Sequence, residues 1–357
     1  MTTSHRFQAG HLHSITRNLL VAAGTFHHIA DDVAEILVKA NLSGHDSHGV
    51  LRVPTYLKSI EGGGIAPSVE PKVTLETGTR SQIDGANGFG HYTARWAMKH
   101  AILKAKETGV YCANLIRIGH IGRLGEYAEA AAIEGCIGLI TLGSGGKEGG
   151  RITPFGGVGG VLGTNPIAIG VPTGDQVPFI IDMATSVIAE GKIQVARSMN
   201  ADLPPGYIVD QQGNPSVKTS DFYDGGFLLP FGQHKGYAIS LLTCLLGGLS
   251  GNFDVEKGRM DGTFMQVIDV NAFTPLETYQ RGVRSFLDGI KSTPPALGFE
   301  EVLVPGDFEQ SSRRQRLVHG IQLPDTIYQQ ICQCAEQLNV SMDRNDVAAA
   351  DMDRYSL

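Results

Sequence analysis

The middle of the chain alternates short apolar runs with longer amphipathic stretches, and this alternation restricts the fold more than any other sequence feature. Short apolar runs bounded by glycine or polar residues are typical of strands, whereas apolar residues at helical spacing are typical of helices. The pattern therefore predicts the α/β fold class for this region. In chain order, we expect a helix at 91–108, strand 110–118, helix 123–135, strands 137–142 and 178–183, helix 186–198, a helix from near 234, a strand near 265, a helix near 276 and a strand near 301.

Both ends of the chain have the pattern of helices instead. Residues 11–24 and 29–42 are amphipathic, and Ile29, Val33 and Leu37 fall on one helical face. A third amphipathic stretch, at about 324–338, lies near the carboxyl end. Two helical ends around an α/β middle predict that the ends pack against each other.

Composition excludes several classes of function. A net charge of -7 argues against nucleic acid or an anionic membrane surface as the main partner. The longest apolar stretch, near 237–249, is interrupted by polar residues and is too short to cross a bilayer. The start of the chain lacks the apolar core of a signal peptide. Five scattered cysteines are typical of buried free thiols in a reducing compartment, so we expect a cytoplasmic protein without a metal site.

The glycine-rich runs do not match the common nucleotide-binding loops. The run from Gly143 to Gly150 follows an expected strand, but Glu148 occupies the third glycine position of the dinucleotide-binding fingerprint. The run from Gly157 to Gly163 fails in the same way, and no Walker motif is present. Surface turns remain an alternative for both runs. A nucleotide bound by this chain therefore needs a different kind of site.

The segment Gly44–Gly49 is the first candidate for chemistry. His48 can pass a proton to or from a hydroxyl group during carbonyl–alcohol interconversion, because imidazole titrates near neutral pH. Ser47 could orient a substrate oxygen, and Arg52 could bind a carboxylate through two parallel hydrogen bonds. A structural alternative is that the polar residues only cap a helix.

Two further segments place polar residues after expected strands. His120 follows one strand, where ligands of α/β proteins usually bind, although a solvated turn histidine is the alternative. Asp182 ends another strand and could hydrogen-bond an imidazole, or serve as the N-cap of the helix expected at 186–198. The residues after it, Met183, Ala184, Thr185 and Ser186, could bring main-chain groups close to a flat ligand.

The sequence His234–Lys235–Gly236 is expected to begin an apolar helix. Free backbone N–H groups, the helix dipole and the Lys235 ammonium group together favour a pyrophosphate at this end. A solvated charge at a helix start is the structural alternative.

Taken together, these segments resemble the type-2 malate/L-lactate dehydrogenase family, a group of NAD(P)-dependent oxidoreductases unrelated to Rossmann dehydrogenases. Four motifs carry the resemblance in order: Gly44–Gly49, Leu162–Pro166, Asp182–Ser186 and His234–Tyr237. The region around 41–50 looks most like the hydroxycarboxylate dehydrogenase branch, which reduces 2-oxo acids with NADH.

The resemblance implies a mixed, largely antiparallel central sheet that is not a Rossmann fold. It also implies a helical domain at 1–75 completed by 305–357, an α/β cofactor-binding and catalytic domain at 76–304, and a homodimer. The implied catalytic residues are Ser47, His48 and Asp182, with His120 as the acid/base in some members. The implied substrate contacts are Arg52, Thr164 and Asn165. The implied cofactor contacts are Ser144, Met183, Ala184, Thr185, Ser186, His234, Lys235, Gly236, Pro305, Gly306 and Asp307.

The chain departs from the family pattern beside the expected pocket, at Arg117–Ile118, at Gln233 and in the run from Gly143 to Gly150. The leading hypothesis is hydride transfer between NAD(H) and C2 of a small 2-hydroxy/2-oxo acid, with NADP not excluded. One alternative is an NAD(P)H-dependent reductase of cyclic imino acids such as piperideine-2-carboxylate. Two others are a metal-dependent hydrolase or lyase built from His45, Asp46, His48 and His120, and a degenerate family member that only binds nucleotide.

Overall fold

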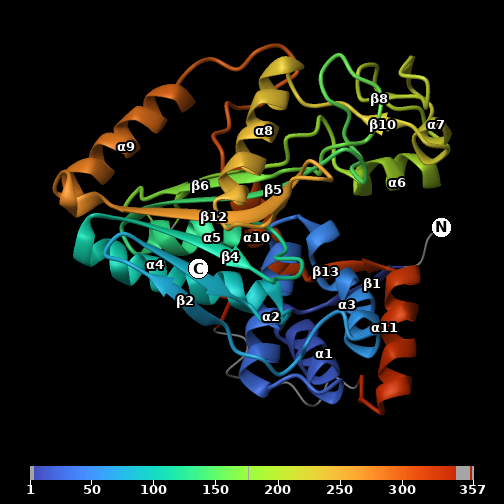
Figure 1. The fold of residues 1–357 in the computed structure, drawn as a ribbon, viewed down its shortest axis with the longest axis horizontal. Coiled ribbons are helices and arrows are strands. Elements are labelled where there is room, and N and C mark those ends of the chain that lie inside the picture. The colour runs from blue at the N-terminus through green and yellow to red at the C-terminus, as the bar shows by residue number, and fades with distance from the viewer. Residues whose placement is uncertain (1–3, 176, 343–353, 356–357) are drawn as a thin grey trace.

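The computed structural model describes residues 4–175, 177–342 and 354–355. Its centre is a twisted sheet in the strand order β2-β3-β4-β12-β5-β6-β7, with β11 paired to β12 (Figure 1). The pair β3–β4 is parallel and the other pairs of this sheet are antiparallel. The predicted mixed, largely antiparallel sheet is therefore confirmed. The strands are β2 (Lys72–Glu76), β3 (Arg80–Asp84), β4 (Val110–Ile116), β5 (Cys136–Gly145), β6 (Ile167–Val171), β7 (Phe179–Met183), β11 (Phe253–Asp254) and β12 (Arg259–Asp269).

Helices cover both faces of this sheet (Figure 1). α4 (Gly90–Thr108) and α5 (Gly125–Ile133) pack on one face through alanines, which let helix and sheet approach closely. α8 (His234–Gly248) packs on β5 and β12 from the other face. α9 (Leu276–Lys291) lies on the same side as α8 but none of its residues is buried.

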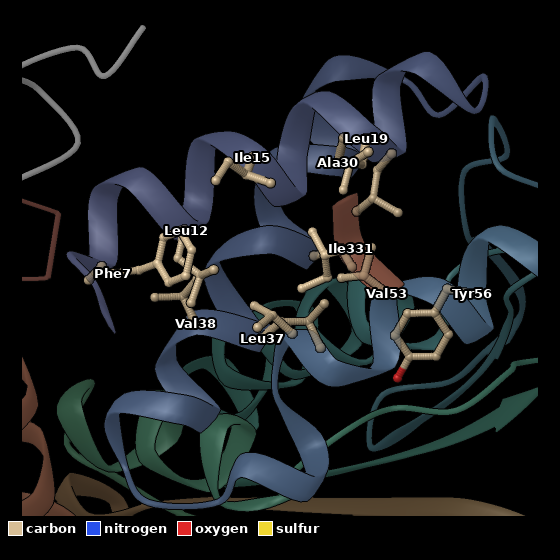
Figure 2. Packing of buried hydrophobic residues seen from close by; sticks show 14 of the residues in the cluster. Phe7, Leu12, Ile15, Leu19, Ala30, Leu37, Val38, Val53, Tyr56 and Ile331 are labelled. Atoms are coloured by element: carbon tan, nitrogen blue, oxygen red, sulfur yellow. The ribbon is translucent and has the colours of Figure 1, made fainter. Parts of the chain in front are cut away.

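The two ends of the chain form one helical unit below the sheet (Figure 1). β1 (Ser4–Phe7) pairs antiparallel with β13 (Ile321–Pro324), so the two ends are joined by main-chain hydrogen bonds. One apolar core draws residues from both ends, as Figure 2 shows for Leu12, Leu37 and Ile331. The division into domains at residues 75 and 305 stays a prediction. The helices here are α1 (Ala9–Ala22), α2 (His27–Leu42), α3 (Val53–Glu61), α10 (Asp307–His319) and α11 (Asp325–Leu338).

A small lobe lies beside the end of β7. It contains a three-stranded sheet in the order β10-β8-β9 and two short helices. Their bounds are β8 (Ile208–Val209), β9 (Pro215–Ser216), β10 (Phe227–Leu228), α6 (Glu190–Ser198) and α7 (Thr219–Tyr223).

Two sequence expectations about the elements are wrong. The helix expected at 186–198 begins at Glu190 with Ala189 as its N-cap, so Asp182 does not cap it. The strand expected near 301 does not form. Residues there run beside β7, but the contact is a single hydrogen bond from Ile180 N to Pro305 O at 3.3 Å. Because proline has no N–H group, Pro305 cannot continue a ladder.

Candidate active site

The segment with the candidate residues Ser47 and His48 is a short turn held against α10. Ser47 and His48 lie in the 3-10 turn Asp46–His48, directly after α2. His45 Nε2 lies 2.9 Å from Glu309 Oε1 of α10. Asp46 accepts two hydrogen bonds from the Arg316 guanidinium group, at 2.6 and 2.9 Å. These two ion pairs anchor the residues just before Ser47, so the turn is positioned by the carboxyl-terminal part of the chain.

Two imidazoles meet in this region. The rings of His48 and His120 stack with centroids 5.7 Å apart and planes inclined by 21°. His48 Nδ1 lies 3.0 Å from Ser47 Oγ, and His120 Nδ1 lies 2.7 Å from Tyr56 Oη. Within the described part of the chain, neither Nε2 atom has a hydrogen-bond partner. Each ring is thus held through Nδ1 and keeps Nε2 for another molecule.

The surroundings keep both imidazoles neutral. Burial, followed by the charges of Arg52, His45 and Arg123, lowers the pKa of His48 to about 4. Desolvation of the ring, followed by His48 and Arg52, lowers the pKa of His120 to about 4 as well, although the residue keeps exposed surface. At pH 7 both rings are therefore proton acceptors. A bound carboxylate near Arg52 would raise both pKa values, because a negative charge favours imidazolium.

Arg52 lies at the end of the second 3-10 turn, Val50–Arg52, and is half-buried. Its Nε donates to Ser47 O at 2.8 Å, which fixes the guanidinium group beside the two imidazoles. No hydrogen bond within the described residues occupies its two terminal nitrogens. This arrangement suits a carboxylate, as the sequence predicts.

The structure corrects one expectation for Asp182. Its Oδ2 accepts hydrogen bonds from Arg123 Nε at 3.2 Å and from Gly125 N at 2.8 Å, at the start of α5. Among the described residues no imidazole bonds to Asp182, because the buried Arg123 guanidinium group lies there instead. Arg123 also acts on the pKa of His48, so Asp182 is linked to the reacting centre through a cation.

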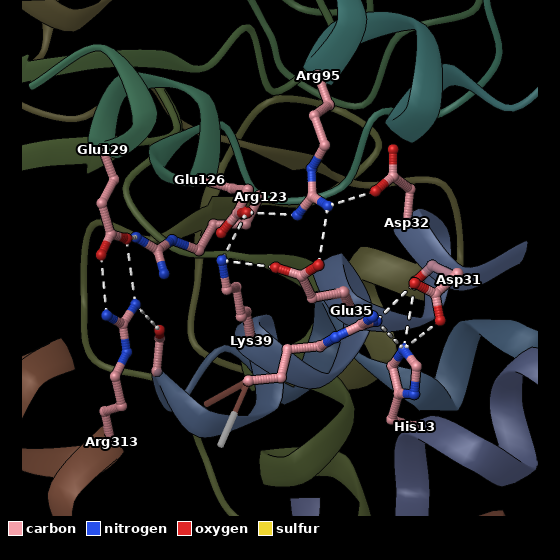
Figure 3. A network of polar contacts seen from close by, with 12 residues as sticks. His13, Asp31, Asp32, Glu35, Lys39, Arg95, Arg123, Glu126, Glu129 and Arg313 are labelled. Carbon is pink, nitrogen blue, oxygen red and sulfur yellow. Dashed lines mark hydrogen bonds and ion pairs between the residues drawn. The ribbon is translucent and has the colours of Figure 1, made fainter. Parts of the chain in front are cut away.

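A network of ion pairs fastens the helical unit to α5 (Figure 3). Arg95 of α4 bonds Asp32 and Glu35 of α2 and Glu126 of α5, at 2.8 to 3.1 Å. Arg95 and Lys39 hold the pKa of Glu35 at about 2, although burial alone would raise it. α5 begins at Gly125, the residue that donates to Asp182, so this network also positions the Asp182 side of the site.

Asn165, expected to touch substrate, is buried and fully engaged within the protein. It is 1% exposed. Its Oδ1 accepts from Ser144 N at 2.9 Å, and its Nδ2 donates to Ser240 Oγ of α8 at 2.9 Å. This burial is inconsistent with a direct substrate contact. Asn165 instead ties the end of β5 to α8, whereas its neighbour Thr164 is exposed.

The segment after Asp182 is brought to the same region. Thr185 donates through N and Oγ1 to Thr164 O, at 2.8 and 3.0 Å, and its carbonyl accepts from Phe231 N at 3.0 Å. Thr185 and Ser186 have buried side chains, whereas Met183 is 39% exposed. Of this segment, Met183 and the half-buried Ala184 have surface for a ligand.

The start of α8 presents exposed His234 and Lys235 side chains. The backbone N–H groups here are less free than the sequence predicts, because Lys235 N and Gly236 N donate to the carbonyls of Gly232 and Phe231. Gly236 is required, since a Cβ there would lie 2.1 Å from Phe231 O. Lys235 has no ion pair with the described residues, so its charge remains available.

The segment Pro305–Asp307 lies at the beginning of β7 and starts α10. Gly306 adopts φ 105° as the N-cap of α10. Asp307 Oδ2 accepts from Lys291 Nζ at 2.8 Å and from Val304 N at 3.0 Å. The carboxylate of Asp307 is thus already paired, and any cofactor contact here remains a prediction.

Sequence reasoning missed two residues of the site. Tyr56 Oη lies 2.7 Å from His120 Nδ1 and 3.4 Å from His91 Nε2. Tyr56 could have been found from its spacing. It lies four residues after Arg52, and residues four apart share one face of a helix. For His91 there was no local signal, because its partners lie in other elements.

The ligand set of the metal-dependent alternative is not assembled. His45 and Asp46 face α10, whereas His48 and His120 face each other. Among the described residues, no group of three or more His, Cys, Asp or Glu side chains is arranged to hold a metal ion. The described residues also contain no helix long and apolar enough to cross a membrane.

Paired neutral imidazoles beside a guanidinium group suit a hydroxy acid, because an imidazole can accept the hydroxyl proton and a guanidinium group can bind the carboxylate. A family model described as malate/L-lactate dehydrogenase matches residues 7–332. The chain belongs to this family, whose members depend on a pyridine nucleotide.

Named relatives agree with this assignment. The chain is 35% identical to malate dehydrogenase of Pyrococcus horikoshii over 344 residues, which cover 92% of this chain and 94% of the relative. It is 32% identical to hydroxycarboxylate dehydrogenase B of Escherichia coli, over 95% of this chain and 96% of the relative.

Solved structures have the same fold. Malate dehydrogenase from Entamoeba histolytica matches with a TM-score of 0.89 at 26% identity, over 95% of this chain and 99% of that one. A piperideine-2-carboxylate reductase from Pseudomonas syringae matches with a TM-score of 0.79 at 30% identity, over 93% of this chain and 100% of that one.

Proposed function

We propose that this enzyme transfers hydride reversibly between NAD(H) and C2 of a small 2-hydroxy/2-oxo carboxylic acid. The observation that carries the proposal is the pair of neutral imidazoles, the half-buried His48 and the exposed His120, beside the Arg52 guanidinium group. A neutral imidazole accepts the hydroxyl proton of the alcohol, and the guanidinium group binds the carboxylate next to it.

The candidate site residues have separate roles in binding and in proton transfer. Arg52 fixes the carboxylate and thereby the carbon atom that reacts. One imidazole, of His48 or His120, removes the hydroxyl proton during oxidation and returns it during reduction. Ser47, within hydrogen-bond distance of His48, holds this ring and can contact the substrate oxygen. Asp182 acts through Arg123, whose charge it partly neutralises next to His48.

The carboxylate of the substrate favours protonation of the imidazole, which is needed when the 2-oxo acid is reduced. In the ligand-free surroundings a pKa of about 4 leaves little imidazolium at pH 7. A substrate anion bound to Arg52 offsets the positive charge that lowers these pKa values, so protonation becomes easier once substrate is present. Proton transfer is thus coupled to the presence of a carboxylate.

The proposal assigns a second group of residues to a pyridine nucleotide. Lys235 supplies an unpaired ammonium group at the start of α8, which suits a diphosphate. Met183 and Ala184 offer surface for a flat ring. Ser144, Thr185, Ser186, His234, Gly236 and the segment Pro305–Asp307 complete the proposed cofactor set, and Thr164 remains a proposed substrate contact. When bound, the nucleotide supplies or accepts the hydride at the reacting carbon.

A substrate panel tests the proposal. Malate, lactate, sulfolactate and larger 2-hydroxy acids would be assayed with NAD and NADP, and the matching 2-oxo acids with NADH and NADPH. Activity with 2-oxo acids and NADH is expected, and it should survive exhaustive chelation. Preference for cyclic imines such as piperideine-2-carboxylate would instead support the second candidate, which the likeness to the Pseudomonas syringae reductase favours.

Replacement of the imidazoles tests the mechanism. Whichever of His48→Ala and His120→Ala removes the general acid/base is expected to lower kcat by a factor on the order of 10²–10⁴. Near-normal turnover in both variants would refute the mechanism. Nucleotide binding without turnover of any acid or imine would instead indicate a binding protein.

The same proposal includes a cytoplasmic homodimer. α8 exposes Leu242 and Leu245 by 49% and 60%, its C-cap Leu249 is 64% exposed, and α9 exposes Phe286 by 66%. Apolar surface of this kind is unusual on a monomer and fits a second copy of the chain. The five cysteines are all free thiols, which supports a reducing compartment.

A further inference from the structure

The Tyr56 hydroxyl group lies between two imidazoles. Tyr56 Oη is 2.7 Å from His120 Nδ1 and 3.4 Å from His91 Nε2. Tyr56 is 5% exposed and His91 is fully buried. His91 Nδ1, on the far side of its ring, has no hydrogen-bond partner. Three elements therefore contribute a continuous line of polar atoms that ends inside the protein.

The close approach of these elements depends on two glycines. A Cβ at Gly90, the first residue of α4, would lie 2.4 Å from Gly119 O and 2.6 Å from His120 O. A Cβ at Gly122 would lie 2.9 Å from the His91 ring, and Gly122 also adopts φ 71°. The backbone is thus shaped so that His91 can approach the segment that carries His120.

The chemistry of a general base fixes the direction of these hydrogen bonds. An imidazole that takes a proton at Nε2 must carry its own proton on Nδ1, so the partner of Nδ1 has to be an acceptor. The Tyr56 oxygen fills this role if its own hydrogen points elsewhere. His91 Nε2 is the acceptor in the correct place, and His91 then carries its proton on Nδ1.

We propose that Tyr56 and His91 are positioning residues for His120. Tyr56 accepts a hydrogen bond from His120 Nδ1–H and donates one to His91 Nε2, which leaves the lone pair of His120 Nε2 for the substrate hydroxyl group. This inference rests on the proposed function, since it assigns the tautomer of the acid/base.

Burial supports this arrangement. It raises the pKa of Tyr56, so the phenol stays protonated and can donate to His91. Burial also keeps the pKa of His91 well below its usual value, so the ring stays neutral and one of its two nitrogens is an acceptor. The other groups that act on His120 are His48 and Arg52, and Arg95 also acts on His91.

Steady-state kinetics form the first test. Tyr56→Phe removes the acceptor and is expected to lower kcat in both directions by roughly 10- to 100-fold. KM for the substrate acid should change less than about threefold, because Arg52 is untouched. Tyr111→Phe is the matched control, since Tyr111 is fully buried in β4 and bonds Glu76, away from the site. It should retain normal kcat.

A pair of variants at His91 separates hydrogen bonding from packing. His91→Gln retains an acceptor near the position of Nε2 and should keep most of the activity. His91→Phe retains the ring volume but not the acceptor, and it should resemble Tyr56→Phe. Equal activity of the two His91 variants and of Tyr56→Phe with the native enzyme would overturn the proposal.

The tautomer itself can be observed without turnover. Nitrogen-15 NMR of histidine-labelled protein, assigned with His120→Gln, should show His120 protonated at Nδ1 in the native enzyme. Tyr56→Phe should shift the population toward the Nε2-protonated form, whereas Tyr111→Phe should not. An Nε2-protonated His120 in the native enzyme would refute the positioning role. The expected spectra in an enzyme inactive toward every acid would instead refute only the proposed function.

Discussion

Gly90→Ala should damage catalysis through a single added methyl group. The new Cβ would lie 2.4 Å from Gly119 O, and real Cβ contacts are essentially never closer than 3.0 Å. The contact is with backbone, so the segment carrying His120 or the start of α4 must move by at least about 0.6 Å. Overpacking of this kind costs about 1–3 kcal/mol of stability.

The displacement should cost more in rate than in stability. A misplacement of about 1 Å can reduce turnover by roughly 10²-fold, so a shift of this size at His120 should lower kcat by about ten- to a hundred-fold. Denaturant unfolding and steady-state kinetics would be measured on the same preparations. The expected result is a large fall in kcat with a folded protein.

Gly289→Ala and Gly282→Ala are the matched controls. Both residues lie in α9, and a Cβ at either position has no heavy atom within 4 Å. Alanine should stabilise α9 by about 0.5–1 kcal/mol without changing kcat. If Gly90→Ala also left stability and kcat within twofold of the native values, the close approach of α4 to residues 119–120 would not be a requirement of the site.

Four further outcomes are expected. Arg52→Gln should raise KM for the acid by about 10- to 100-fold with less effect on nucleotide affinity, measured by kinetics and NADH titration. Lys235→Ala should instead raise the Kd for NADH at least severalfold and leave KM for the acid nearly unchanged. For alcohol oxidation, kcat/KM should stay flat from pH 8 to about 5 and fall near pH 4, because His48 and His120 are protonated only below their lowered pKa; loss of activity already at pH 6.5 would contradict these shifts. Leu245→Asp should dissociate the dimer in light scattering, and an unchanged mass would exclude α8 from the interface.

The chemistry of the site was predictable from sequence because its key groups are close together along the chain. Ser47, His48 and Arg52 lie in two consecutive 3-10 turns, Asp46–His48 and Val50–Arg52, so any compact folding of this segment brings them together. The start of α8 was predictable for a similar reason, since a helix boundary is a local property. Local sequence thus indicated a candidate proton carrier, a candidate group for binding a carboxylate and a cation at a helix start.

The partners of these groups were not predictable, because they come from distant elements. Asp182 has the sequence context expected for an imidazole partner, but in the structure it accepts a hydrogen bond from Arg123 instead. Asn165 has the context of a ligand contact, but it holds Ser144 and α8 together. Periodicity and motif spacing carry no information on which of two polar groups lies nearer after folding.

The ion pairs at α10 show why the motif by itself does not define a site. His45 and Asp46 belong to the same six-residue segment as His48, and the metal-dependent alternative uses all three as ligands. Glu309 and Arg316 bind the first two and so turn them away from the imidazole pair. Of the three titratable side chains in this segment, only that of His48 lies beside His120, because the carboxyl-terminal helix binds the other two. The two ends of the chain must therefore meet before the candidate acid/base His48 is distinguished from the residues that hold the turn.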